Sequence, residues 1–149
     1  MADNWNAFDE WESFVNDHPK FAAINVNGIE CVPSLANNAV SCKIIRFTHG
    51  TYNAVFDVRF ENGVSWILRV HRIETDVESG CTKAKIESMV ATMRLIRLRT
   101  SIPIPEIYAF ESDHTLSSIG AAYILMEAMR GAEVDGDEET LSEDDVVAV

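Results

Sequence analysis

Three places in the middle of the chain, Gly50, Arg69 and Glu87, carry residue types that could together bind a phosphate chain. A fourth place, the segment at Met126 and Glu127, offers backbone groups that could bind an adenine edge. A glycine lets backbone N–H groups approach phosphate oxygens, because no Cβ stands in the way. An arginine can neutralise phosphate charge, and a nearby carboxylate can hold that cation in place. Each signal is weak by itself, so its value depends on the elements that position it.

Residues 42–72 predict three successive strands, which would carry Gly50 and Arg69. The strands cover 43–48, 54–60 and 64–71. HGTYN forms the first turn, and Asn62-Gly63 suits the positive φ values of a two-residue type I′ turn. Apolar residues alternate along the second and third strands, so each offers one apolar face. Arg69 falls on the face opposite the apolar one.

A long helix and two further strands are predicted after the meander. The helix covers 81–99, with an apolar stripe at Ile86, Met89, Val90, Met93 and Ile96. Glu87 lies beside this stripe among bases, and 74–80 is predicted as a loop or a frayed helix start. Two prolines within 101–105 force an extended path. Strands follow at 106–110 and 121–128, and the second is so apolar that we expect both its faces to be covered.

The N-terminal part predicts a helical extension. Trp5, Phe8, Trp11 and Val15 repeat at spacings of three and four, which is typical of an amphipathic helix over 5–15. We expect this helix to pack on the domain, and a partner-binding helix is the alternative. Residues 25–41 are rich in turn formers and predict one short helix at 33–37.

Charge and cysteine content exclude several classes of protein. The formal net charge is −12, and it belongs to the ends, since 132–149 holds eight acids and no base. An acidic chain without a basic face argues against nucleic acid as a partner. Three cysteines without CxxC spacing, no secretory signal and no apolar run of about 20 residues favour a cytoplasmic protein that does not enter a membrane. In the acidic tail, Ser142 could cap a helix that ends with the chain after about two turns. We therefore interpret 132–149 as the start of a truncated second lobe, or else as a disordered tail.

Two runs resemble the aminoglycoside-phosphotransferase/choline-kinase-like family in its fungal form. They are IESMVATMRLIRLRTSIPIPEIYAFES and IGAAYILMEAMRG, similar to that family's recurrent E-V-A-T-M…T-x-I-P-V-P and G-x-x-Y-I-L-M-E…G. The similarity covers roughly 42–131. It implies that Gly50, Thr51 and Asn53 belong to the nucleotide loop. It puts Arg69 in the place of the phosphate-binding lysine, Glu87 in that of the helix acid, and Met126, Glu127 and Ala128 at the hinge beside the nucleotide.

The resemblance implies an α+β fold, namely a protein-kinase-like N-terminal lobe with a five-stranded antiparallel sheet, one long helix and an N-terminal helical extension. The domains would be a helical extension at 1–41, the small nucleotide-binding lobe at 42–131, and the tail at 132–149. The implied activity is ATP-dependent phosphorylation of a hydroxyl on an unknown small-molecule acceptor, with Mg²⁺.

The family's H-x-D catalytic loop and its later metal-binding aspartate have no counterpart here. His49-Gly50-Thr51 and His71-Arg72-Ile73 look similar but lack the carboxylate. We therefore expect a nucleotide-binding lobe that is inactive alone, with its Mg²⁺ ligands in a missing lobe. The alternatives are a non-catalytic interaction or scaffold module, with the aromatic N-terminal helix as its contact, and a truncated gene product without independent function.

Overall fold

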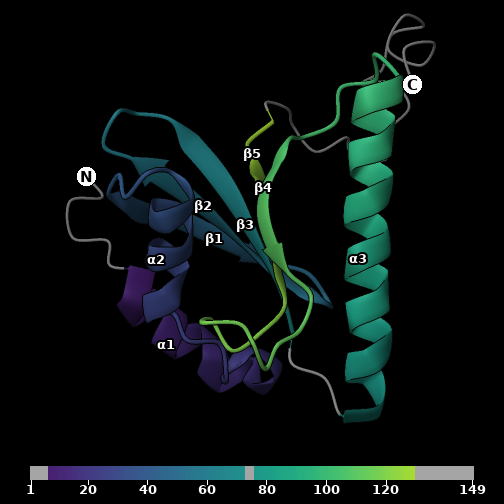
Figure 1. Cartoon of the computed structure of the whole chain (residues 1–149). Helices are drawn as coiled ribbons and strands as arrows, with labels where there is room; N and C mark the ends of the chain where they lie inside the picture. Colours follow the sequence, from purple (N-terminus) through teal and green to yellow (C-terminus); the bar gives the residue numbers. More distant parts are fainter. Residues whose placement is uncertain (1–6, 73–75, 130–149) are drawn as a thin grey trace, which may run out of the picture.

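The computed structural model describes residues 7–72 and 76–129, which form an α+β fold (Figure 1). The elements in chain order are α1 (Ala7–Asp17), the 3₁₀ helix η1 (Pro19–Phe21), α2 (Asn27–Ala36), β1 (Cys42–His49), β2 (Asn53–Phe60), β3 (Ser65–His71), α3 (Asp76–Arg99), β4 (Ile107–Glu111) and β5 (Tyr123–Glu127). The strands form one antiparallel sheet in the order β1-β2-β3-β5-β4. This arrangement confirms the predicted kinase-like N-terminal lobe.

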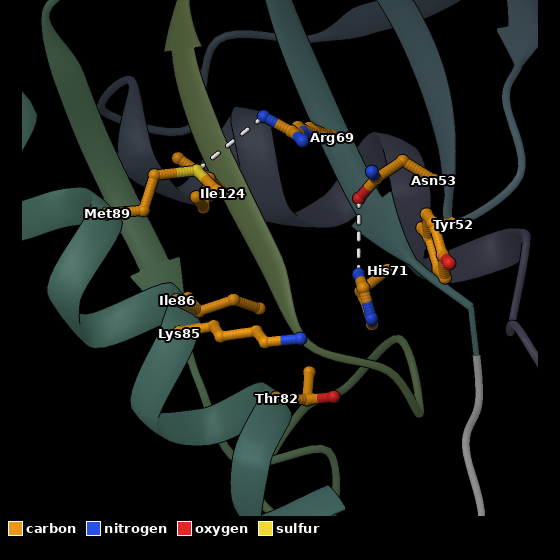
Figure 2. A pocket seen from close by; sticks show the side chains of 9 residues that line it. All are labelled: Tyr52, Asn53, Arg69, His71, Thr82, Lys85, Ile86, Met89 and Ile124. Carbon is orange, nitrogen blue, oxygen red and sulfur yellow. Dashed lines mark hydrogen bonds between the residues drawn. The ribbon is translucent and has the colours of Figure 1, made fainter. Parts of the chain in front are cut away.

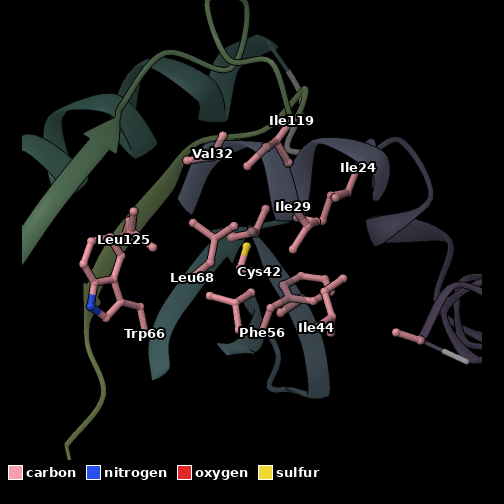
Figure 3. Packing of buried hydrophobic residues seen from close by; sticks show 14 of the residues in the cluster. Ile24, Ile29, Val32, Cys42, Ile44, Phe56, Trp66, Leu68, Ile119 and Leu125 are labelled. Atoms are coloured by element: carbon pink, nitrogen blue, oxygen red, sulfur yellow. The ribbon is translucent and has the colours of Figure 1, made fainter. Parts of the chain in front are cut away.

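The face of the sheet toward α1 and α2 holds the main hydrophobic core (Figure 3). Alternate residues of β2 and β3 point into it, because a pleated strand sends successive side chains to opposite faces. They are Ala54, Phe56, Val58 and Phe60 from β2, and Trp66, Leu68 and Val70 from β3. The helices contribute Trp11, Ile29 and Val32 to the same core. The predicted apolar faces of both strands are therefore present.

The other face of the sheet packs against α3 (Figure 1). Ile86 and Val90 of α3 are buried against Ile107 of β4 and Ile124 of β5. Leu125, the next residue of β5, belongs to the main core. The prediction that this apolar strand is covered on both faces is therefore confirmed.

The N-terminal helix packs on the sheet, as expected. Trp11 is only 4% exposed. Its ring centroid lies 5.3 Å from that of Phe47 on β1 and 5.1 Å from that of Phe56 on β2. The extension and the sheet thus share one core, while Trp5 lies outside the described residues.

Helix α3 begins at Asp76 instead of residue 81, which confirms the helix start that was one of the two alternatives for 74–80. Two local predictions need correction. Helix α2 runs over Asn27–Ala36 instead of 33–37 and keeps Pro33 inside, because its apolar face is buried on the sheet and tertiary packing outweighs the weak helical propensity. The second hairpin turn is a three-residue loop, since the Phe60 N–H donates to the Val64 carbonyl at 2.8 Å. It is not a type I′ turn, because only Gly63 of its three residues has a positive φ, of 87°.

The remaining predictions concern the acidic tail and a membrane crossing. The expected helix start at Ser142, and with it the whole 132–149 segment, lies outside the described residues. None of the described helices combines the length and the apolar character that a membrane crossing requires.

Candidate functional site

A pocket of about 240 Å³ lies between the sheet and α3 (Figure 2). Its described lining consists of Tyr52, Asn53, Arg69, His71, Thr82, Lys85, Ile86, Met89 and Ile124. The lining comes from the turn before β2, from β2 and β3, from β5 and from α3. It contains two permanent cations, Arg69 and Lys85, and no carboxylate among these residues. A pocket of this composition suits an anionic ligand.

Helix α3 presents one face to the pocket. Thr82, Lys85, Ile86 and Met89 are separated by three, one and three residues, so they lie on one side of a helix. Ile86 is buried. The exposed Lys85 extends its long apolar stem from the helix and presents its ammonium group to the pocket (Figure 2).

Arg69 enters the pocket from β3 because alternation points it away from the main core. Its Nη1 lies 3.6 Å from Met89 Sδ, a thioether that is only a weak acceptor. The ion pairs within the described part of the chain join Arg46 to Asp57, and Arg97 to Glu106 and Glu127. None of them involves Arg69, so its guanidinium is held by a methionine rather than by an acid.

Glu87 does not meet Arg69. Its Oε1 accepts a hydrogen bond of 2.9 Å from Ser112 Oγ, in the loop after β4. Residues two apart on a helix point in different directions. When Met89 faces Arg69, Glu87 must therefore face elsewhere, and the expected contact between Arg69 and Glu87 is not formed.

The glycine turn between β1 and β2 is shared between two hollows. Asn53 lines the pocket, and its Oδ1 lies 3.3 Å from His71 Nδ1. Gly50 and Thr51 instead line a second hollow beside η1. Gly50 N–H donates to the Asn53 carbonyl at 2.9 Å, which closes the turn. A Cβ built on Gly50 would meet nothing within 4 Å, so the fold itself does not require a glycine there.

The hinge residues lie away from this pocket. Glu127 N–H donates to the Glu106 carbonyl at 2.8 Å, and Glu127 Oε1 accepts from Glu106 N–H at 3.1 Å. The same oxygen lies 3.8 Å from Arg97 Nη1. The Glu127 carboxylate therefore ties β5 to the proline-rich segment, while Met126 packs beside the smaller hydrophobic cluster and Ala128 follows β5 half-buried.

The described residues that line the pocket do not form a magnesium site. Mg²⁺ is bound through carboxylates and other oxygen ligands in octahedral geometry. The oxygen donors of the described lining are Asn53, Thr82 and Tyr52, which are all neutral. The described residues also contain no group of three His, Cys, Asp or Glu side chains that could hold a metal ion.

Comparison with known proteins gives the family. The phosphotransferase enzyme family (APH) matches residues 43–149. This chain belongs to that family. Two curated relatives, subtelomeric hrmA-associated cluster proteins from two strains of Aspergillus fumigatus, are each 34% identical to it over 103 residues. The match covers 69% of the chain and 19% of each relative, so the chain spans about a fifth of their length. No solved structure matches the chain.

The family motif and the geometry agree on which helix position faces the cation. When E-V-A-T-M is written onto this phosphotransferase-family chain, it falls on residues 89–93, which read M-V-A-T-M. Met89 therefore stands where the motif has its acid. This one-letter comparison could have identified the position from the sequence. Lys85 also lines the pocket, although nothing in the sequence analysis singled it out. It lies three residues after Thr82 and four before Met89, so helical spacing puts the three residues on one side of α3.

Proposed function

We propose that this chain is the nucleotide-binding lobe of a phosphotransferase that uses ATP to phosphorylate a hydroxyl group on a small molecule. Membership of the phosphotransferase family supports the reaction class. The observation that carries the proposal is Arg69 on β3, which points into a pocket between the sheet and α3. Phosphoryl transfer depends mainly on positioning and on neutralising phosphate charge, and this guanidinium supplies a fixed positive charge.

Each predicted site residue has a role in this proposal. Arg69 binds phosphate oxygens, for which its planar fork is suited. The Asn53 amide offers a neutral donor from the same wall. The turn at Gly50 and Thr51 offers the Thr51 N–H to phosphate, since the Gly50 N–H already donates to the Asn53 carbonyl. The main chain at Met126–Ala128 binds the adenine edge through groups other than the Glu127 N–H, which donates to the Glu106 carbonyl. Glu87 stays a predicted member of the site, and its hydrogen bond to Ser112 makes it a group that positions the loop after β4.

The chain would bind nucleotide without turning it over by itself. None of its four histidines is followed two residues later by an aspartate, so it lacks an H-x-D base. Magnesium would be held outside the described residues, and the acceptor would contact parts of the enzyme beyond this lobe. We also propose that the protein works in the cytoplasm and not on nucleic acid, in keeping with its free cysteines and its net charge of −12.

The decisive experiment is a thermal unfolding titration of the full chain with Mg-ATP. At 100 times its dissociation constant, a ligand that binds only the folded state adds about 2.7 kcal/mol of stability. For a chain of this size the Tm would rise by roughly 5–10 °C. Arg69→Ala should remove most of the rise, and Arg59→Ala, which removes an exposed charge from β2 outside the pocket, should keep it. Lack of any rise with millimolar ATP, ADP or GTP would contradict the proposal.

The alternative is an interaction module that binds a partner through its aromatic N-terminal helix. The aromatic residue Trp11 of this helix is not accessible to a partner. Trp11 is buried against Phe47 and Phe56 and offers no surface to a partner. The same titration separates the two functions, since an interaction module needs no response to nucleotide.

A further inference from the structure

We propose that Lys85 is a second anion-binding residue of this pocket, and that a phosphate group bridges Lys85 on α3 and Arg69 on β3. The bound anion would take the place of the ion pair that an acid at position 89 would make with Arg69. This inference rests on the proposed function and deepens it, because it names the residues and the charge pattern that hold the phosphate chain.

The charges that line the pocket support this assignment. Arg69 and Lys85 come from two elements that face each other, and neither forms an ion pair within the described part of the chain. The other polar residues of the described lining carry no permanent charge, and they are Tyr52, Asn53, His71 and Thr82. Two cations on opposite walls repel each other until an anion lies between them. The pocket is also a positive site on a chain whose formal net charge is −12.

The contacts around Arg69 support the bridging role. Its described polar contact with α3 is the weak one from Nη1 to Met89 Sδ at 3.6 Å. Helix α3 is otherwise attached to the sheet in this region through apolar packing of Ile86 and Val90. A phosphate group bound by both cations would add charge-assisted hydrogen bonds across this gap, which are stronger than neutral ones. Anion binding would therefore fasten α3 to the sheet.

Lys85 differs from the other bases of α3 in its surroundings. Arg94 lies over the Phe110 ring, with its Cζ 5.4 Å from the centroid. Arg97 donates to the Ile104 carbonyl at 2.8 Å. Lys83 is exposed, carries the same charge as Lys85 two residues earlier, and does not line the pocket. Lys83 is therefore a matched control for the effect of net charge.

Calorimetric titration of the full chain with inorganic tripolyphosphate, and separately with ATP, tests the assignment. EDTA in both titrations removes any contribution from metal. We expect Lys85→Ala to weaken binding of both ligands by about tenfold, as for one lost charged hydrogen bond. Lys83→Ala should change the affinity by less than about twofold, because screening in salt removes most of a distant surface charge effect.

A second variant tests the consequence of the missing acid. Met89→Glu should weaken tripolyphosphate binding by at least about threefold in EDTA, because the new carboxylate pairs with Arg69 and repels phosphate. Met89→Gln, of similar shape and without charge, should bind like the unmodified chain. Tighter binding by Met89→Glu would overturn the bridging arrangement.

The outcomes separate this inference from the proposed function. If the unmodified chain binds ATP and Lys85→Ala matches Lys83→Ala, Lys85 is an ordinary surface lysine and the inference is wrong, while nucleotide binding stands. If the unmodified chain binds neither ATP nor tripolyphosphate, both proposals are wrong. If bound tripolyphosphate also slows amide hydrogen exchange in residues 82–93, the anion fastens α3, and unchanged exchange would contradict that role.

Discussion

The two faces of the sheet differ in how they are covered. Toward α1 and α2, the sheet meets a continuous apolar layer in which Phe56, Leu68 and Leu125 are fully buried. Toward α3, a smaller cluster around Ile86, Val90 and Ile124 leaves a pocket beside it. The first face buries most of the apolar core residues of the described fold, and the second keeps charged side chains near a cavity.

Strand β3 shows how one segment serves both faces. Leu68 has no exposed surface, and its neighbour Arg69 lines the pocket. Consecutive side chains of a strand point to opposite faces, so a single residue separates a core position from a ligand position. A shift of the β3 register by one residue would exchange the two. The four predictions below ask whether stability and binding are divided between the faces in this way.

The largest expected effect is on the face covered by α1. Trp11→Ala removes a buried ring that contacts Phe47 and Phe56, so it should reduce the free energy of unfolding by about 3–5 kcal/mol. Leu98→Ala removes an apolar side chain that is 81% exposed, and should change stability by less than about 0.5 kcal/mol. Urea unfolding followed by circular dichroism measures both. Equal losses in the two variants would mean that the N-terminal helix does not belong to the core.

Substitution of two glycines, Gly120 and Gly50, should affect stability and ATP binding differently. Gly120 has a φ of 81°, and a Cβ there would lie 3.2 Å from the Ala23 carbonyl oxygen, so Gly120→Ala should reduce stability by about 1–2 kcal/mol. Gly50→Ala meets open space and should leave stability within about 0.5 kcal/mol, but it should weaken ATP binding if the turn contacts phosphate. Thermal unfolding with and without ATP reports both effects. A Gly50→Ala variant that binds ATP normally would remove this turn from the site.

On the pocket face, a cation that has no acid partner among the described residues should lower stability when no ligand is bound. Arg69→Met replaces a half-buried charge with an apolar side chain that can pack on Met89, and should raise the free energy of unfolding by about 0.5–1 kcal/mol. The same variant should lose the stabilisation by ATP. A decrease of more than about 1 kcal/mol would show instead that Arg69 holds the fold together.

The smallest effect concerns the three thiols. Burial raises the pKa of the Cys42 thiol to about 11, and its Sγ donates to the Glu30 carbonyl at 3.1 Å. A thiol with a raised pKa stays protonated at pH 8 and reacts slowly. Exposed Cys31 and Cys81 should therefore react with a disulfide reagent at pH 8, while Cys42 should react only after unfolding. Three fast thiols would indicate that the core face opens readily.

Much of the fold was predictable because it depends on local periodicity. The alternation in β2 and β3, the stripe on α3 and the apolar run of β5 all appear in the structure at nearly the predicted residues. The misses lie where packing outweighs local preference. Helix α2 continues through Pro33 because Ile29 and Val32 are buried on the sheet. The turn at Asn62-Gly63 has three residues instead of the two predicted, and only Gly63 takes a positive φ.

The sequence alone determined the strands, the long helix, the family resemblance and the position of Arg69, since strand alternation puts that residue opposite the core whatever packs there. Only the tertiary structure decided what Arg69 faces. Glu87, the acid assigned to it, bonds to Ser112, while Met89 and Lys85 take the helix side of the pocket. The physical reason is rotation: each helical residue turns the side-chain direction by about 100°, and only the docking of α3 on the sheet fixes which direction meets the strand.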